Sequence, residues 1–307
     1  MMKKKILVIQ GSNLKKVNVK TDTTLFLALE AQKRNFQIYY YEPKDLSFLD
    51  GRVIAKCISL TFYENRNFFY KIKKKLDIEL SKANILLIRN EPPFDQQYIN
   101  STFILEHIEK EIKIINHPKS IREVPEKLFS IRLSKYMPST LISQNFEEIN
   151  KFFKKNKKVI LKPIEGYSGN EVVLLKKFNK RIVSRYLKKY NHIIFQKFLP
   201  KIKNGDRRVF IINGKVKGSI TRVPKQGSIL SNMSKGAVAK INKLTIRELK
   251  ISREVASLLI KKNIYFAGID FVQGKLIGDI NVTSPTGLVT YYNLTGINLA
   301  KYFWDNI

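Results

Sequence analysis

The sequence predicts an α/β protein that begins with a doubly wound parallel sheet. Short uninterrupted apolar runs at residues 5–9 (KILVI) and 85–88 (ILLI) are typical of buried strands. Residues 23–35 lie between two predicted strands and space their apolar side chains as a helix does. Strand and helix then continue to alternate, which is the pattern of a doubly wound fold.

The first domain is predicted to span residues 1–121. Its expected strands cover residues 5–9, 37–41, 51–60, 85–88 and 112–116. Its expected helices cover residues 23–35, 68–80 and 102–111, the second being lysine-rich and amphipathic. Pro118 closes the last strand.

Arg89 directly follows the strand at residues 85–88 and precedes a Pro-Pro turn. Because ligands bind at the carboxyl ends of strands in open parallel sheets, Arg89 is a candidate to bind a carboxylate with two parallel hydrogen bonds. A surface arginine before a loop is the alternative, and position alone does not separate the two.

The charge balance is strongly basic. Lys and Arg total 57 and Asp and Glu total 25 in the 307 residues, which gives a net charge of +32. Such a balance can serve nucleic acid or an anionic membrane. However, the lysines occur in every segment and form no single basic arm, and no nucleic-acid-binding motif is present. A general compositional bias is therefore favoured, and no specific nucleic-acid partner is expected.

Cys57 is the only cysteine, which excludes a disulfide framework and a Cys-based zinc site in this sequence and indicates a reducing compartment. Its neighbours form a strand pattern, so a buried structural thiol is expected. The first apolar run is too short for a signal peptide, and no run reaches the roughly 18 residues of a membrane span. We therefore expect a cytoplasmic protein with no membrane partner.

The second domain is predicted at residues 122–307. Residues 158–163 and 172–175 should form a hairpin, with Lys162 at the end of its first strand. Its connecting turn, residues 165–170, carries two glycines and could close over phosphates with backbone N–H groups, although many hairpins contain glycine. Lys127 is expected on a helix. Further expected elements are strands at 193–199, 209–212 and 215–222, a mobile polar loop at 226–236, and helices at 246–261 and 296–304.

Residues 268–287 (GIDFVQGKLIGDINVTSPTG) should form two strands around a tight turn. This hairpin carries Asp270, Asp279 and Asn281, whose side-chain oxygens suit a hard divalent cation such as Mg²⁺. Short acidic patterns also recur by chance, so loop residues without a ligand are the alternative. Similarly, Arg208 at a strand entry can be solvated or can face a triphosphate.

Taken in order, ILKP, a glycine-bearing loop, GDRR and D…DIN resemble the ATP-grasp ligases. RNEPPFD, HPKSIREVPEKL, QKFLPKIKNGDRRVFIINGK and NVTSPTG resemble the prokaryotic glutathione synthetases, over about residues 20–287. The resemblance implies an N-terminal substrate-binding domain (1–121) followed by a two-subdomain ATP-grasp fold (122–307). The smaller lid subdomain is expected at about residues 130–196.

The resemblance also implies roles for individual residues. Two groups are implied to be catalytic, Lys162 and Arg208. The residues implied to bind the nucleotide are Lys127, Lys162, Gly166, Gly169, Gln196, Lys197, Phe198, Leu199, Asp206 and Arg208. Arg89 and Asn232 are implied to face the peptide. The implied metal ligands are Asp270, Asp279 and Asn281.

The reaction implied by the resemblance joins γ-glutamylcysteine to glycine, with ATP consumed through an acyl phosphate. Mg²⁺ is the implied metal, with Mn²⁺ as an alternative. A homo-oligomer is the implied assembly, and the resemblance suggests a homo-tetramer. Two other hypotheses remain open from the residues: a ligase of the same fold for another peptide or amino-acid acceptor, and a degenerate nucleotide-binding protein.

Several positions depart from the family pattern. Asp279 stands where the family has Glu, Leu230 stands where it has Arg, and residues 288–291 replace a stretch that contains Arg and Glu. The 268–287 hairpin also carries one extra residue. A three-residue turn at 273–275 would absorb it, whereas a two-residue turn is expected to rotate the ligands to the wrong face.

Overall fold

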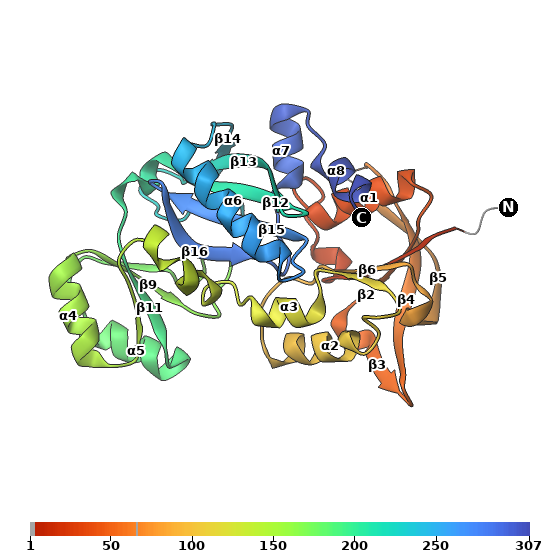
Figure 1. Ribbon diagram of the computed structural model, residues 1–307, viewed down its shortest axis with the longest axis horizontal. Helices are drawn as coiled ribbons and strands as arrows, with labels where there is room; N and C mark the ends of the chain where they lie inside the picture. Colours follow the sequence, from red (N-terminus) through yellow and green to blue (C-terminus); the bar gives the residue numbers. More distant parts are fainter. Residues whose placement is uncertain (1–3, 66) are drawn as a thin grey trace.

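The computed structural model describes residues 4–65 and 67–307 and is built on three sheets (Figure 1). The first sheet has seven strands, the second four and the third five. The sheets follow one another along the chain, and helices cover them, as an α/β fold requires.

The first sheet has a parallel centre. The strands β1 (Ile6–Gln10), β2 (Gln37–Tyr41), β6 (Ile85–Ile88) and β7 (Lys113–Ile115) run parallel in the order β2-β1-β6-β7. Their flanking helices are α1 (Thr23–Lys33), α2 (Gln96–Glu106) and α3 (Pro118–Glu123). Because β2 and β6 lie on opposite sides of β1, the strand order reverses there, and such a reversal opens a crevice at the carboxyl ends.

An antiparallel hairpin extends this sheet and overturns one prediction. The lysine-rich segment is strand β5 (Tyr70–Glu79), not a helix, and it pairs along β4 (Arg52–Phe62). Strand β3 (Leu46–Leu49) pairs with the start of β4 on its other side. The backbone of β5 gains a full ladder of hydrogen bonds with β4, which outweighs the helix propensity of its lysines.

Helix α2 also differs from the prediction, whereas Cys57 agrees with it. Helix α2 begins at Gln96, six residues before the expected position, because the Asp95 side chain accepts a hydrogen bond from the Tyr98 backbone N–H at 2.9 Å and caps the helix. Cys57 on β4 is buried, as expected, and burial raises the pKa of its thiol to about 12.

The second sheet forms a separate layer with its own core. It consists of β8 (Thr140–Ser143), β9 (Val159–Pro163), β10 (Val173–Leu175) and β11 (Ile193–Lys197), in the order β10-β9-β11-β8. Helices α4 (Phe146–Asn156) and α5 (Lys180–Tyr190) supply apolar side chains to that core. The expected β9–β10 hairpin is present.

The third sheet carries most of the polar site. Its strands are β12 (Asp206–Ile212), β13 (Lys215–Val223), β14 (Val238–Lys240), β15 (Phe266–Val272) and β16 (Lys275–Asn281), in the order β14-β13-β12-β15-β16. One face packs against α6 (Ile246–Ile260) through residues such as Val209, Ile269 and Val255. Alternation along the strands therefore turns Arg208 and Asp270 to the opposite face.

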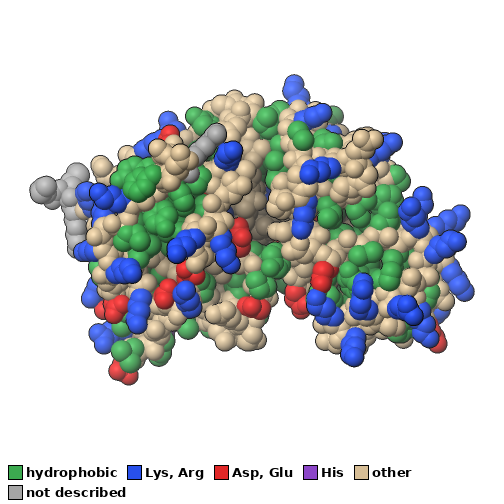
Figure 2. Space-filling view, turned by 180° about the vertical axis from the view of Figure 1, so that it is seen from behind, with side chains coloured by type: hydrophobic (Ala, Val, Ile, Leu, Met, Phe, Trp, Pro, Cys, Tyr) green, Lys and Arg blue, Asp and Glu red, His purple; other side chains and the backbone are tan. Residues whose placement is uncertain are grey.

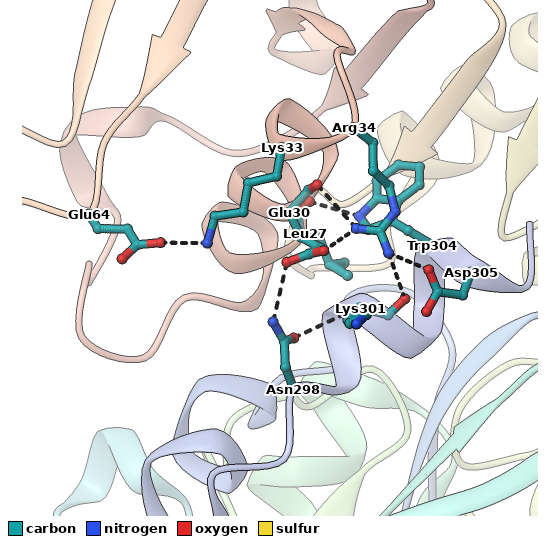
Figure 3. Close-up of polar contacts among 9 residues, drawn as sticks. All are labelled: Leu27, Glu30, Lys33, Arg34, Glu64, Asn298, Lys301, Trp304 and Asp305. Carbon is teal, nitrogen blue, oxygen red and sulfur yellow. Dashed lines mark hydrogen bonds and ion pairs between the residues drawn. The ribbon is translucent and has the colours of Figure 1, made fainter.

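The C-terminal helices return to the first sheet. Helix α7 (Leu288–Thr295), which the sequence did not predict, and α8 (Leu299–Asp305) lie beside α1 (Figure 1). The Trp304 indole N–H donates to the Leu27 carbonyl at 2.8 Å, and Arg34 pairs with both Glu30 and Asp305 (Figure 3).

The surface carries its positive charge in many places. Figure 2 shows Lys and Arg side chains scattered over one face of the molecule, without a single basic patch. Within residues 4–65 and 67–307 the structure contains no helix with the length and apolar character needed to span a bilayer.

Candidate active site

One large cavity, with a volume of about 990 Å³, lies where the three sheets meet. Figure 2 shows the molecule hollowed between its two lobes. Every residue predicted to belong to the site lines this cavity: Arg89, Lys127, Lys162, Gly166, Gly169, Gln196, Lys197, Phe198, Leu199, Asp206, Arg208, Asn232, Asp270, Asp279 and Asn281. The volume lies at the upper end of the usual range for ligand pockets.

A buried network of two arginines and two aspartates forms the floor of the cavity. Arg208 binds Asp270 with two parallel hydrogen bonds, of which the Nη2–Oδ2 bond is 2.7 Å. Arg222 binds Asp206 in the same way, with an Nε–Oδ1 distance of 2.8 Å, and also donates to Asp270 Oδ2 at 2.9 Å. Paired in this way, four charges can remain buried.

The two aspartates respond differently to this environment. Burial alone would raise the pKa of Asp270, but the positive charges of Arg208 and Arg222 outweigh burial and lower it to about 2. Burial raises the pKa of Asp206, and Arg222 opposes that rise. Asp270 is therefore an anion at neutral pH, and both of its oxygens accept hydrogen bonds from arginine.

The β15–β16 hairpin turns in two residues. Val272 pairs with Lys275, so Gln273 and Gly274 alone form the turn, both with positive φ. This is the geometry that right-handed strand twist favours in short hairpins. The three-residue turn that would have absorbed the extra residue is therefore not the one that this hairpin adopts.

A bulge farther along the hairpin keeps the ligands together. Ile269 pairs with Ile280, and Phe271 pairs with Leu276, so Asp270 lies opposite three residues, 277–279. The bulge adds two residues, an even number, and side-chain alternation resumes in phase after it. Asp270, Asp279 and Asn281 all line the cavity. The expectation that a two-residue turn would rotate these predicted ligands to the wrong face is therefore wrong.

The donor set at this hairpin fits a hard cation. The Asn281 Oδ1 atom is buried and has no hydrogen-bond partner, and the Asp279 carboxylate is partly exposed to the cavity. Among the described residues no three His, Cys, Asp or Glu side chains gather as a metal site, so the set needs the Asn281 amide. An orphaned oxygen beside a carboxylate suits Mg²⁺, which takes oxygen ligands.

Two lysines enter the cavity above the hairpin. The Lys162 ammonium, on β9, donates to the Ile277 carbonyl at 2.8 Å and lies 3.7 Å from Asp279 Oδ1. Burial lowers the pKa of Lys162, and the nearby Asp279 charge opposes that effect. Lys127 donates to the carbonyls of Ile164 and Gly166, and it lies in a turn rather than on the expected helix.

Two loops meet at one side of the cavity. Gly169 has a φ of +70°, and a Cβ added there would lie 2.5 Å from Asn232 Oδ1. The Lys235 ammonium donates to Asn170 Oδ1 at 2.9 Å. The glycine-bearing turn and the polar loop 226–236 therefore touch, and glycine is required where they approach.

Arg89 occupies the crevice beside β1 and β6. Its Nε donates to Thr24 Oγ1 at 3.1 Å and its Nη2 donates to the Pro285 carbonyl at 2.9 Å. Burial lowers the pKa of Arg89 to about 10, with the charge of Asp22 opposing this change. The arginine is buried, which excludes the alternative of a surface arginine, and it connects the first sheet to the segment after β16.

Arg222 and Glu126 are two charged residues among the cavity residues that were not predicted from the sequence. Arg222 ends the strand predicted at 215–222, and the Asn213-Gly214 turn places it near Asp206. Counting residues outward from the turn pairs Asp206 with Thr221, and a bulge at 210–211 shifts the partner to Arg222. Glu126 also lines the cavity, and burial raises the pKa of its carboxyl group. Its position before Lys127 was the available signal.

Solved structures share this architecture. The chain superimposes on D-cycloserine synthetase DcsG with a TM-score of 0.67 and 12% identity, covering 98% of this chain and 97% of that chain. The ATP-grasp ligase PsnB, complexed with a minimal precursor, gives a TM-score of 0.62 and 12% identity over 99% of this chain and 97% of that one. These likenesses confirm the predicted ATP-grasp fold.

Sequence relatives are closer. A glutathione synthetase from Bradyrhizobium diazoefficiens is 35% identical over 303 residues, 97% of this chain and 96% of its own. One from Buchnera aphidicola subsp. Schizaphis graminum is 35% identical over 304 residues, 95% and 94% of the two chains. The family models for the prokaryotic glutathione synthetase N-terminal domain and ATP-grasp domain match residues 5–122 and 126–296. The chain therefore belongs to the prokaryotic glutathione synthetase family.

Proposed function

We propose that this cavity joins γ-glutamylcysteine to glycine through an acyl phosphate, with ATP bound over the third sheet. The family makes the chain an ATP-dependent ligase of glutathione synthesis. One observation supports the proposed site above all. The crevice at the first sheet, the lysines Lys127 and Lys162, and the hairpin with its carboxylate and amide groups all line the same cavity.

The nucleotide is proposed to lie between the second and third sheets. Residues 196–199 line the cavity where the chain leaves β11, and their backbone would hold the adenine. Lys127 and Lys162 would neutralise phosphate charge, and Gly166 and Gly169 let the backbone approach the phosphates. Asp206 and Arg208 complete the nucleotide side. These assignments rest on position in the cavity and on the chemistry of each group.

A divalent cation is proposed at Asp279 and Asn281, with Asp270 as the third ligand. Mg²⁺ is the proposed metal, with Mn²⁺ as the alternative, because the donors are all oxygen. When bound, the cation would supply charge stabilisation to the phosphate oxygens. Asp270 must share its oxygens with Arg208 and Arg222, which fixes the orientation of its carboxylate.

In the proposed reaction the protein mainly positions the substrates and stabilises charge, and it forms no covalent bond to them. The carboxylate of the peptide's cysteine attacks the γ-phosphorus, the bond to ADP breaks, and an acyl phosphate forms. The glycine amine then attacks the acyl carbon, phosphate leaves, and the nitrogen gives up a proton. Lys162 and Arg208 would stabilise the charge that develops, while Arg89 and Asn232 hold the peptide.

We also propose a role for each domain, an oligomeric state and a cellular location. Residues 1–121 would bind the peptide, residues 122–307 would bind the nucleotide, and residues 130–196 would act as the lid. A cytoplasmic homo-oligomer without a nucleic-acid or membrane partner remains the expectation, with a tetramer as the assembly that the family resemblance suggests.

The test is release of ADP by the purified protein. With MgATP, γ-glutamylcysteine and glycine we expect ADP, phosphate and glutathione in equal amounts, measured by a coupled assay and mass spectrometry. Omission of either amino-acid substrate, or removal of the cation with EDTA, should abolish glutathione. ATP binding without ADP release from this substrate pair would contradict the proposal. Replacing glycine by other amino acids would then show whether another acceptor is used.

A further inference from the structure

Tyr98 has a side chain that the fold itself does not explain. It lies on α2, only 2% of its surface is exposed, and its hydroxyl group is buried without a hydrogen-bond partner. The same side chain lines the large cavity, in the crevice that also holds Arg89. Buried hydroxyl groups are nearly always paired, so an unpaired one beside a cavity indicates a ligand.

The position of the Tyr98 ring is fixed on several sides. Its backbone N–H donates to Asp95 Oδ1 at 2.9 Å, and its carbonyl accepts from Ser101 Oγ at 2.8 Å. The ring packs on Phe94 with a centroid distance of 5.0 Å. The hydroxyl group is therefore held in place before any ligand arrives, which lowers the entropy cost of using it.

Arg89 supplies a charge for the same ligand. Its Nη1 atom is buried without a partner, and among the described residues Arg89 forms no ion pair. Asp22, the carboxylate whose charge acts on Arg89 most strongly, ahead of Glu91, is already used to cap α1 through the Leu25 N–H at 2.6 Å. A buried guanidinium with no carboxylate partner and an unpaired hydroxyl group line the same cavity and can together form a receptor for an anion, and a carboxylate fits both donors.

We propose that Tyr98 donates a hydrogen bond to the substrate carboxylate that Arg89 binds, and that Tyr98 thereby determines specificity for the peptide. This inference rests on the proposed function. The carboxylate concerned is the one on the glutamyl residue, because the cysteine carboxylate must face the γ-phosphate beside Lys162. The charge of Arg89, which opposes the effect of burial on the pKa of Tyr98, is consistent with their closeness.

The main test compares Tyr98→Phe with the wild type and with Tyr39→Phe. Tyr39 is also buried in the first sheet, but its hydroxyl group accepts from Gln37 at 2.7 Å and does not line the cavity. We expect Tyr98→Phe to raise KM for γ-glutamylcysteine about tenfold or more, as for a hydrogen bond to a charged group. Its kcat and its KM for ATP should stay within twofold of wild type, and Tyr39→Phe should change none of the three.

A truncated substrate identifies which carboxylate is recognised. 4-Aminobutanoyl-cysteine lacks the glutamyl α-carboxylate but keeps the carboxylate that reacts. With this substrate, wild type and Tyr98→Phe should have the same KM. An equal loss on both substrates, or an unchanged KM on γ-glutamylcysteine, would overturn the inference, the latter outcome pointing to a buried water as the partner.

Thermal unfolding separates recognition from a structural role. Because the wild-type hydroxyl group is unpaired, Tyr98→Phe should leave the melting temperature of the free protein unchanged or slightly raised. The rise in melting temperature on adding γ-glutamylcysteine should shrink, in the absence of ATP. A free variant that melts several degrees lower would refute the assignment. Failure of the wild type to make glutathione would instead count against the proposed function.

Discussion

The charged side chains at the two ends of the cavity differ in whether they have ion-pair partners. Over the third sheet, Arg208 and Arg222 each bind an aspartate through paired hydrogen bonds. In the crevice of the first sheet, Arg89 has no ion pair among the described residues and Tyr98 has an unpaired hydroxyl group. The charges over the third sheet are paired within the protein and stabilise the fold, whereas the polar groups in the crevice, Arg89 and Tyr98, are proposed to bind a ligand.

This difference has an energetic meaning. Removing one member of a buried ion pair leaves the other charge unpaired and destabilises the fold strongly. Removing a buried group that has no partner costs little, and what is lost is binding. Substitutions at the two ends should therefore separate stability from substrate affinity.

The largest effect on stability is expected for Arg222→Met. It leaves Asp206 without its ion pair and should lower the free energy of unfolding by about 3–5 kcal/mol. Lys33→Met is the matched control, since the exposed Lys33–Glu64 pair should contribute less than about 1 kcal/mol. Urea denaturation measures both, and similar losses in the two variants would contradict the comparison.

Lys162→Met should weaken ATP binding. Loss of one charge-assisted contact corresponds to about 1.5–3 kcal/mol, or a rise of about 10- to 100-fold in KM for ATP, with KM for the peptide nearly unchanged. Lys158→Met, an exposed lysine next to the same strand that does not line the cavity, is the control. If both variants keep wild-type affinity for ATP, Lys162 is not a phosphate ligand.

Gly278→Ala tests the bulge that brings the predicted metal ligands together. Gly278 has a φ of +88°, and a Cβ there would lie 3.0 Å from Met137 Cε and 3.1 Å from Ser130 Oγ. Gly274→Ala, with a φ of +70° and open space around it, introduces only the backbone strain. Gly278→Ala should therefore be less stable than Gly274→Ala by about 1–3 kcal/mol, the usual cost of overpacking. Equal unfolding curves would show that the bulge can relax.

Only a small effect on stability is expected for Arg89→Met. Its unfolding free energy should lie within about 1 kcal/mol of wild type, because the lost bonds to Thr24 and Pro285 are offset by removal of a buried charge without an ion pair. Its KM for the peptide should nevertheless rise tenfold or more. A loss of stability as large as that of Arg222→Met would remove the distinction between the two ends.

Sequence patterns predicted the architecture well where strands were short and apolar. They failed at β5, where Tyr70, Ile72, Leu76 and Ile78 do alternate, but Lys74 interrupts them and the gap from Ile72 to Leu76 matches a helical turn. A bulge near Ser59–Leu60 also moves the apolar residues before and after it to opposite faces, beside different cores. Such a pairing depends on β4 and cannot be read from β5 alone.

The candidate site could be predicted in its members but not in its geometry. All the predicted residues line one cavity, and their roles stay predictions. The predicted metal ligands converge because Gly278 permits a bulge. In the sequence, a glycine inside a strand pattern was the available signal for that bulge. The pairing of Arg222 with Asp206 and the unpaired hydroxyl group of Tyr98 depend on contacts between distant segments, which a single sequence does not contain.

The bond from Lys162 to the Ile277 carbonyl joins the second sheet to the third across the cavity. The ammonium group that is proposed to bind a phosphate therefore also holds the two sheets together through a hydrogen bond. An anion that binds the ammonium group competes with its hydrogen bond to Ile277. Anion binding and the distance between the two sheets are therefore thermodynamically linked. Since linkage is reciprocal, whatever separates the layers must change the affinity for the anion by the same factor.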